Sequence, residues 1–284
     1  MIPHLFHPHI STWGEGPVWW QDHFYYVDIT GHLLGRIDPV SGENKTWDVG
    51  QRIGFALPCK DGRWIWGGDK GLFFIDLSTG KSTFITDPES ELPDNRFNDA
   101  AVSPDGRLFA GSIATTKVKG SANLYRMDSD LSCHLVFPQV TNSNGMGWSP
   151  NGKRCYYIDT PSYNIRRFDY DQNSGVISNE IILFNTEADY EGVPDGMCVD
   201  NEENLWIAFC HGGCVVKFDR NGDFLEKIDF PTIETTSCCF GGPKHQDLYV
   251  TTGTSAGTQD EPDAGKTFII KNAGQGLPQV PVNI

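Results

Sequence analysis

The stretch Asp105-Gly106-Arg107-Leu108-Phe109-Ala110 is a polar turn followed by a short hydrophobic run. An Asp-Gly pair is favoured in the tight turns of β-hairpins, and a short hydrophobic run after such a turn is typical of a strand. A second run of this kind, Leu124-Tyr125-Arg126-Met127, follows and ends at Asp128. The stretch therefore predicts a small unit of antiparallel strands.

The same unit recurs along the whole chain. Hydrophobic runs that follow a polar turn occupy residues 24–27, 64–66, 108–110, 155–158, 205–208 and 248–251. The equivalent turn residues are Asp22, Asp61, Asp105, Asn151, Glu202 and His245, separated by 39, 44, 46, 51 and 43 residues. A period of this size indicates propeller blades of four strands, and helical periodicity is nearly absent.

We therefore expect an all-β protein. The prediction is a six-bladed β-propeller with four-stranded antiparallel blades around a central channel, forming one domain over residues 1–284. The N-terminal segment is expected to complete the last blade and close the ring.

Charge and hydropathy limit the classes of partner that the protein is expected to bind. The 22 Lys and Arg against 37 Asp and Glu give a formal net charge of -15, which disfavours nucleic acid and anionic membranes as partners and suits cations or small molecules. The N-terminus lacks the layout of a signal peptide, and no stretch approaches the roughly 20 apolar residues of a membrane span. We expect a cytoplasmic protein, and the sequence leaves its oligomeric state open.

The eight cysteines are spread thinly over the chain, unlike those of a disulfide scaffold, and we interpret them as buried thiols. A structural zinc site needs four ligands. Cys210, Cys214 and the neighbouring His211 are too few, so the sequence predicts no structural zinc site there.

A shared register identifies candidate site residues. Counting back seven residues from each turn residue reaches the start of the innermost strand of each blade, at Glu15, Gly54, Asn98, Asn144, Asp195 and Cys238. Such positions point toward the axis at similar heights. Two carboxylates and two amides in one ring suit a hard divalent cation; the alternative is a polar lining of a water-filled tunnel.

Two arginines lie near this ring. Arg52 and Arg96 stand two residues before Gly54 and Asn98, on the same strand face and nearer the channel mouth. They could hold an oxygen of a substrate or, taken singly, pair with a neighbouring Asp such as Asp94 or Asp99.

Several motifs in fixed order carry a family resemblance. They are Gly14-Glu15-Gly16-Pro17-Val18-Trp19, Asn95-Arg96-Phe97-Asn98-Asp99, Ser143-Asn144-Gly145-Met146, Pro194-Asp195-Gly196-Met197-Cys198-Val199-Asp200 and Cys239-Phe240-Gly241-Gly242. Together they resemble the SMP-30/gluconolactonase/regucalcin family of sugar lactonases, from about Trp13 to about Lys271.

The resemblance implies a six-bladed propeller with one axial divalent cation. Glu15, Asn144 and Asp195 would be its ligands, Asn98 would lie beside them, and Arg96 would contact the substrate. An all-oxygen ligand set favours Ca²⁺ first and also fits Mg²⁺ or Mn²⁺, with Zn²⁺ or Fe²⁺ as further options. Related proteins tend to carry a Glu where this chain has Thr116, which leaves the identity of the sugar open.

The expected activity is hydrolysis of a sugar lactone to the aldonic acid. The cation would polarise the lactone carbonyl, and Asp195 would be the general base for water. Arg96, Asn98 and Arg52 would hold the substrate. Two alternatives stay open: a non-catalytic calcium-binding or regulatory propeller, and a hydrolase of another lactone or ester.

One further pattern imitates a calcium loop. Asp169, Asp171, Asn173 and Glu180 have nearly the spacing of an EF-hand, but Ser174 occupies the position where that loop requires Gly. We interpret the segment as a hairpin turn.

Overall fold

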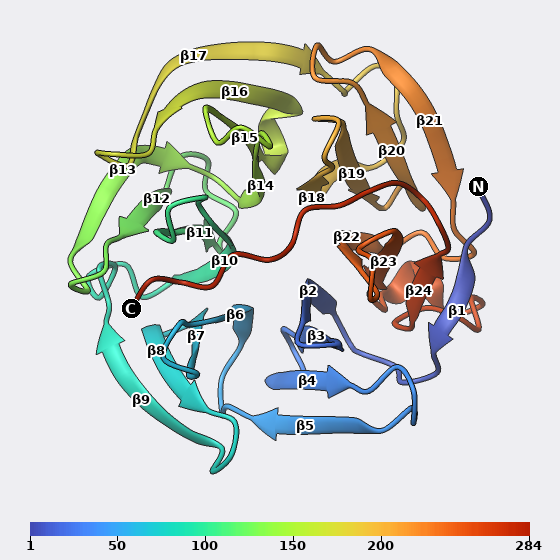
Figure 1. The fold of residues 1–284 in the computed structure, drawn as a ribbon, viewed down its shortest axis with the longest axis horizontal. Helices are drawn as coiled ribbons and strands as arrows, with labels where there is room; N and C mark the ends of the chain where they lie inside the picture. Colours follow the sequence, from blue (N-terminus) through green and yellow to red (C-terminus); the bar gives the residue numbers. More distant parts are fainter.

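The structure, a computed structural model, describes residues Met1 to Ile284 and consists of six four-stranded antiparallel sheets arranged in a ring (Figure 1). Each sheet is one blade, and its first strand in the chain, except in the case of β1, lies innermost (Figure 1). The predicted six-bladed β-propeller is therefore confirmed. All six predicted hydrophobic runs lie in the second strands of the blades.

The strands follow the chain order blade by blade. Blade 1 contains β2 (Gly14–Trp20), β3 (His23–Asp28), β4 (Leu33–Ile37) and β5 (Asn44–Asp48). Blade 2 contains β6 (Ile53–Pro58), β7 (Trp64–Gly68), β8 (Gly71–Asp76) and β9 (Lys81–Thr86). Blade 3 contains β10 (Asn95–Val102), β11 (Leu108–Ala114), β12 (Ala122–Met127) and β13 (Cys133–Val140).

The other three blades repeat this pattern. Blade 4 contains β14 (Ser143–Trp148), β15 (Arg154–Asp159), β16 (Asn164–Asp171) and β17 (Val176–Asn185). Blade 5 contains β18 (Val193–Val199), β19 (Leu205–Cys210), β20 (Cys214–Phe218) and β21 (Phe224–Asp229). Blade 6 contains β22 (Thr235–Gly241), β23 (Asp247–Thr252), β24 (Thr267–Ile270) and β1 (His4–His7). The helices are two short 3-10 turns, η1 (Thr160–Ser162) and η2 (Ala256–Thr258), and the protein has no helix able to cross a bilayer.

Blade 6 combines the N-terminal strand with the last three strands of the chain. Strand β1 pairs antiparallel with β24, and the Phe6 ring packs edge-on against Tyr249 and Phe24 at centroid distances of 4.8 and 5.6 Å. The predicted closure of the ring by the N-terminal segment is confirmed. This arrangement gives β24 a partner on its outer edge, which would otherwise offer unpaired backbone groups.

Each inner strand carries a bulge near its start. The pairing with the second strand shifts register at Gly54, at Asn98, and at the residues just after Ser143, Pro194 and Glu15. A bulge redirects the side chains beside it, and these bulges coincide with the register positions of blades 1 to 5.

Blade 6 departs from the predicted register. Its bulge falls at Thr236, whereas the count of seven residues from His245 had reached Cys238. Nine residues separate Thr236 from His245, so the inner strand and turn of this blade are two residues longer than expected. Cys238 lies two residues after Thr236 on β22, and its Sγ is 3.7 Å from that of Cys198 in blade 5.

The blades pack through large buried side chains. Trp66, Trp206, Tyr156 and Tyr157 are among the largest fully buried residues. At Gly54 the blades approach so closely that a Cβ would lie 2.4 Å from the backbone oxygen of Asn98. Glycine is therefore required there by packing, and blade 2 contributes no side chain to the ring.

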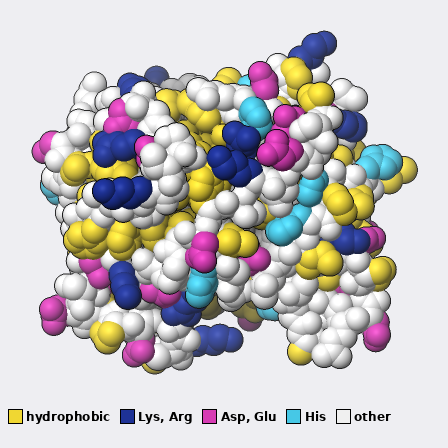
Figure 2. Space-filling view, turned by 90° about the horizontal axis from the view of Figure 1, so that it is seen from below, with side chains coloured by type: hydrophobic (Ala, Val, Ile, Leu, Met, Phe, Trp, Pro, Cys, Tyr) yellow, Lys and Arg dark blue, Asp and Glu magenta, His cyan; other side chains and the backbone are white.

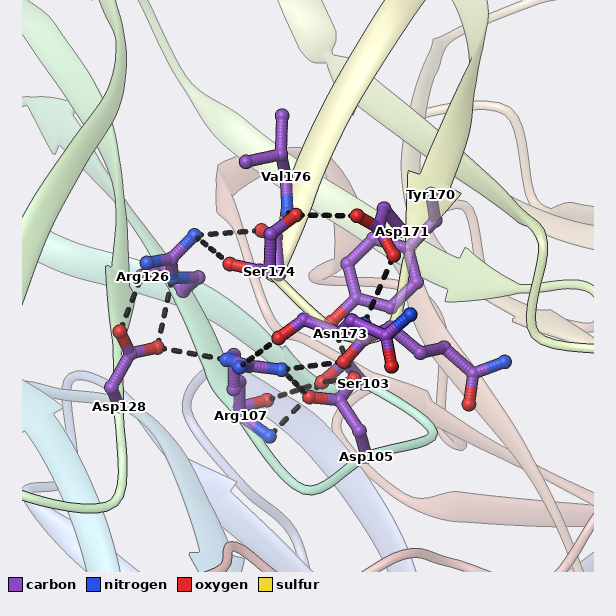
Figure 3. A network of polar contacts seen from close by, with 12 residues as sticks. Ser103, Asp105, Arg107, Arg126, Asp128, Tyr170, Asp171, Asn173, Ser174 and Val176 are labelled. Atoms are coloured by element: carbon purple, nitrogen blue, oxygen red, sulfur yellow. Dashed lines mark hydrogen bonds and ion pairs between the residues drawn. The ribbon is translucent and has the colours of Figure 1, made fainter.

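Polar contacts join blade 3 to the hairpin turn of blade 4 (Figure 3). Arg107 donates to the carbonyls of Gln172 and Asn173, and Arg126 donates to those of Ser174 and Gly175. The EF-hand-like segment is thus the turn between β16 and β17, as predicted. Its carbonyls accept guanidinium N–H groups instead of facing a calcium ion.

The C-terminal segment crosses one end of the channel, from blade 6 toward blades 2 and 3 (Figure 1). Gly276 forms an isolated bridge with Asp200, and Val282 forms one with Cys59. Residues 277–280 help to enclose a cavity of about 390 Å³ that includes Asp99. The segment therefore narrows the end of the channel opposite the first residues of the inner strands.

The rim of the ring carries mixed charge. On the face drawn in Figure 2, basic, acidic and His side chains are interspersed with hydrophobic ones. No single sign of charge dominates that face.

Candidate metal centre

Four polar side chains of the predicted ring are buried around the channel. Glu15 on β2, Asn98 on β10, Asn144 on β14 and Asp195 on β18 are 6, 9, 4 and 7% exposed. Each comes from the start of an inner strand, where the bulge is located. The structure therefore brings these residues together from four different blades.

Hydrogen bonds hold the two amides in fixed orientations. Asn98 Nδ2 donates to Ser143 O at 2.8 Å and to Asn144 Oδ1 at 3.2 Å. Asn144 Nδ2 donates to Thr160 Oγ1 at 2.7 Å, and the Thr160 hydroxyl donates to Pro194 O at 2.9 Å. Each Oδ1 accepts one hydrogen bond, from Arg96 in the case of Asn98 and from Asn98 in the case of Asn144, so one lone pair of each Oδ1 remains for the site.

The carboxylates of the site have no cationic partner at contact distance. Glu15 Oε2 accepts only from the Gly16 backbone N–H, at 2.8 Å, and Asp195 and Asp99 form no ion pair. Burial raises the pKa of Glu15 well above its usual value, and the charges of Asp195 and Asp99 raise it further. Burial and the charge of Asp99 likewise raise the pKa of Asp195, and burial raises that of Asp99 to about 6.

This donor set fits a divalent cation. Buried carboxylates that repel one another are costly unless an opposite charge compensates them. Here the carboxylate and amide oxygens are hard donors, which are the ligands preferred by Ca²⁺, Mg²⁺ and Mn²⁺. The residues present are therefore those that such an ion needs.

The two predicted arginines differ in their contacts. Arg96 donates through Nη1 to Phe97 O and to Asn98 Oδ1, each at 2.9 Å, and forms no ion pair. Burial and the charge of Arg52 lower the pKa of Arg96 to about 10, so its guanidinium is protonated at neutral pH. Arg52 forms an ion pair with Asp69, with Nη2 2.7 Å from Oδ1. The sequence had left a pairing of each arginine with a neighbouring Asp open, with Asp94 and Asp99 as examples, and for Arg52 the partner is Asp69.

Several residues of the site were not predicted from the sequence. Asp99 directly follows Asn98 and adds a third carboxylate near the axis, as its effect on the pKa of Glu15 and Asp195 shows. Thr160 lies in η1 and joins Asn144 to blade 5. Thr236 takes the blade 6 position, where its hydroxyl donates to Gly14 O at 2.6 Å. Of these, only Asp99 had a sequence signal, its place beside Asn98 in a quoted motif.

Thr116 lies in the exposed turn that follows β11. Strand β11 pairs with β10, and Arg96 on β10 is opposite Ile113. The position therefore belongs to the same end of blade 3 as Arg96.

Known proteins with similar sequences and structures share this architecture. The SMP-30/Gluconolactonase/LRE-like region matches residues 13–254. Regucalcin of Danio rerio is 34% identical over 275 residues, covering 93% of this chain and 92% of its own. A calcium-binding protein, regucalcin, from Agrobacterium tumefaciens has a TM-score of 0.94 at 23% identity, covering 99% of this chain and 97% of its own.

A gluconolactonase from Xanthomonas campestris, XC5397, has a TM-score of 0.78 at 21% identity, covering 95% of this chain and 89% of its own. At these identities the solved structures support the fold, whereas the family match and the Danio rerio relative extend over most of the sequence. The chain belongs to the SMP-30/gluconolactonase/LRE-like family.

Proposed function

We propose that the protein is a divalent-metal-dependent lactonase that opens a sugar lactone to its aldonic acid. The observation that carries the proposal is the ring of buried oxygen donors, Glu15, Asn144 and Asp195, whose carboxylates lack a cationic partner, next to the unpaired guanidinium of Arg96. Membership of a family named for gluconolactonase supports the reaction class. Ca²⁺ is the first choice of ion because a structural neighbour named regucalcin is described as calcium-binding.

When bound, a divalent cation supplies Lewis-acid stabilisation of the negative charge that develops during ester hydrolysis. Glu15, Asn144 and Asp195 would hold it. Asp195 also serves as the general base in this proposal, because its buried carboxylate forms no ion pair and burial raises its pKa. It removes the proton of the attacking water.

Substrate orientation is assigned to blades 2 and 3. Arg96 keeps its remaining N–H groups free of protein acceptors, and these groups would bind hydroxyl or carbonyl oxygens of the lactone. Asn98 fixes the Arg96 guanidinium through Oδ1, and Arg52, held by Asp69, adds a second positive charge nearby. A neutral lactone would enter this end, and its anionic product would be attracted to the arginines until released.

The test is a panel of aldonolactones assayed with chelated protein and after return of each divalent metal. We expect acid release only with metal, and its loss in Asp195→Asn. The control is Asp61→Asn, which changes a carboxylate in a turn where its side-chain partner is Arg63. Absence of turnover with every metal and every lactone would refute the proposed lactonase activity.

A non-catalytic calcium-binding protein is the second candidate, favoured by the description of the regucalcin neighbour. It predicts calcium affinity that depends on Glu15 and Asp195 without turnover of any lactone or ester. A wider ester panel separates it from a hydrolase of a different lactone. A cytoplasmic location remains part of the proposal, supported by eight cysteines that are all free.

A further inference from the structure

A cluster of sulfur, nitrogen and oxygen donors lies between blades 5 and 6. Cys210 ends β19, His211 begins the turn to β20, and Glu234 immediately precedes β22. An isolated β-bridge between Cys210 and Glu234 joins the two segments. One potential ligand atom from each of the three side chains lies within 4.8 Å of the other two.

The three side chains already share contacts. Glu234 Oε2 is 2.7 Å from His211 Nδ1 and accepts from the Cys210 thiol at 3.4 Å. Glu234 is 1% exposed and Cys210 is 3% exposed, whereas the His211 side chain is 57% exposed. No Lys or Arg forms an ion pair with the buried Glu234 carboxylate.

The positions of these three side chains suit a tetrahedrally coordinated metal ion. Ligand bonds of roughly 2.0–2.3 Å place oxygen and sulfur ligands about 3.6 Å apart and nitrogen and oxygen ligands about 3.3 Å apart. The separation of Cys210 Sγ from Glu234 Oε2 is already close to this value. The His211 ring must move so that Nδ1 lies farther from Glu234 Oε2 than the present 2.7 Å and about 3.5 Å from Cys210 Sγ, and the exposure of His211 allows this movement.

We propose that Cys210, His211 and Glu234 form a second metal site, distinct from the axial ring, for a zinc-class divalent cation. A thiolate and an imidazole select such ions over Ca²⁺, whereas the oxygen donors of the ring favour hard ions. Three protein ligands leave a fourth position for water. The cation replaces the proton of the Cys210 thiol, and this proton passes to solvent.

The site adjoins the axial ring without sharing a proposed ligand with it. Burial raises the pKa of the Cys210 thiol, and the charge of the nearby Asp195 raises it further. A cation held by Cys210 would therefore add positive charge beside the ring. This inference does not depend on the proposed lactonase activity.

Cobalt spectroscopy on the calcium-loaded full-length protein tests the proposal, because only a sulfur ligand gives a thiolate-to-cobalt charge-transfer band. We expect one equivalent of Co²⁺ to produce this band and Zn²⁺ to abolish it by competition. The band should be absent in Cys210→Ser and strongly weakened in Glu234→Gln and His211→Ala. His211 is exposed, so its variant keeps the test valid if the buried variants fail to fold.

Two controls separate this site from others. Cys214→Ala removes a buried thiol at the start of β20, four residues after Cys210, and should keep the band. Glu15→Gln alters the axial ring and should also keep it, even if lactone hydrolysis is lost. A wild-type protein that shows no charge-transfer band at saturating Co²⁺, or a band that survives in Cys210→Ser, overturns the proposal.

Discussion

Thr160 offers the sharpest test of how the ring is held together. Its hydroxyl accepts from Asn144 Nδ2 at 2.7 Å and donates to Pro194 O at 2.9 Å. Thr160→Val keeps the shape of the side chain and removes both contacts. The buried amide of Asn144 and the carbonyl of Pro194 would then lack partners.

The structure sets the size of the effect. Each buried polar group left unpaired costs about 1–3 kcal/mol, so with two such groups we expect the free energy of unfolding to fall by roughly 2–6 kcal/mol. Loss of the contact also frees the Asn144 amide to rotate away from the axis. Removing the residues that orient metal ligands lowers metal affinity about 10–100-fold, and the same loss is expected here.

Isothermal titration with Ca²⁺ measures the affinity, and urea unfolding of the metal-free protein measures the stability. Thr160→Ser is the matched control because it retains the hydroxyl, and it should remain within a few-fold of wild type. If Thr160→Val lowers stability but binds Ca²⁺ as tightly as wild type, Asn144 is not a ligand. If the wild-type protein itself binds no divalent cation, the ring is a polar tunnel lining.

Three further substitutions test the fold by thermal or urea unfolding. Phe6→Ala should lower the free energy of unfolding by about 1–3 kcal/mol, because Phe6 packs β1 onto the rest of blade 6. Its control, Phe84→Ala in β9, should leave that free energy nearly unchanged, since Phe84 is 57% exposed. Glu89→Ala should lower the free energy of unfolding by about 3 kcal/mol, because the buried Glu89 carboxylate accepts hydrogen bonds from four side chains. The control is Glu91→Ala at an exposed position. Equal stability of the two variants would contradict the expectation. Val282→Ala should cost about 2 kcal/mol if the C-terminal segment is docked as the structure has it, and an unchanged midpoint would show that it is not.

The fold was predictable because the turn between the first two strands of each blade has a recognisable composition. Asp-Gly and Asn-Gly pairs mark three of these turns, and strands follow at once. The ring residues of blades 1 to 5 followed because the distance from the bulge region to the turn is the same in those blades. In blade 6 that distance is longer, so the same count reached Cys238 in place of Thr236.

The remaining parts of the site had no periodic signal. Thr160 lies in the 3-10 turn that directly follows β15 in blade 4, whereas the other 3-10 turn, η2 in blade 6, starts four residues after the end of β23, so comparison of repeats does not reveal it. Glu234 reaches His211 and Cys210 across a blade boundary, from 23 and 24 residues away. Contacts between blades depend on three-dimensional packing, and they are the ones that the sequence left undetermined.

The six blades have the same four-stranded fold, but they do not all supply polar side chains to the ring. Gly54 in blade 2 is required by the close approach of Asn98, and Thr236 in blade 6 uses its hydroxyl to hold the backbone of blade 1. The proposed ligands Glu15, Asn144 and Asp195 thus come from blades 1, 4 and 5, Asn98 of blade 3 lies beside them, and blades 2 and 6 close the ring through backbone contacts. A cation held in this way would bind three blades at once, so metal binding and the stability of the whole ring should rise together.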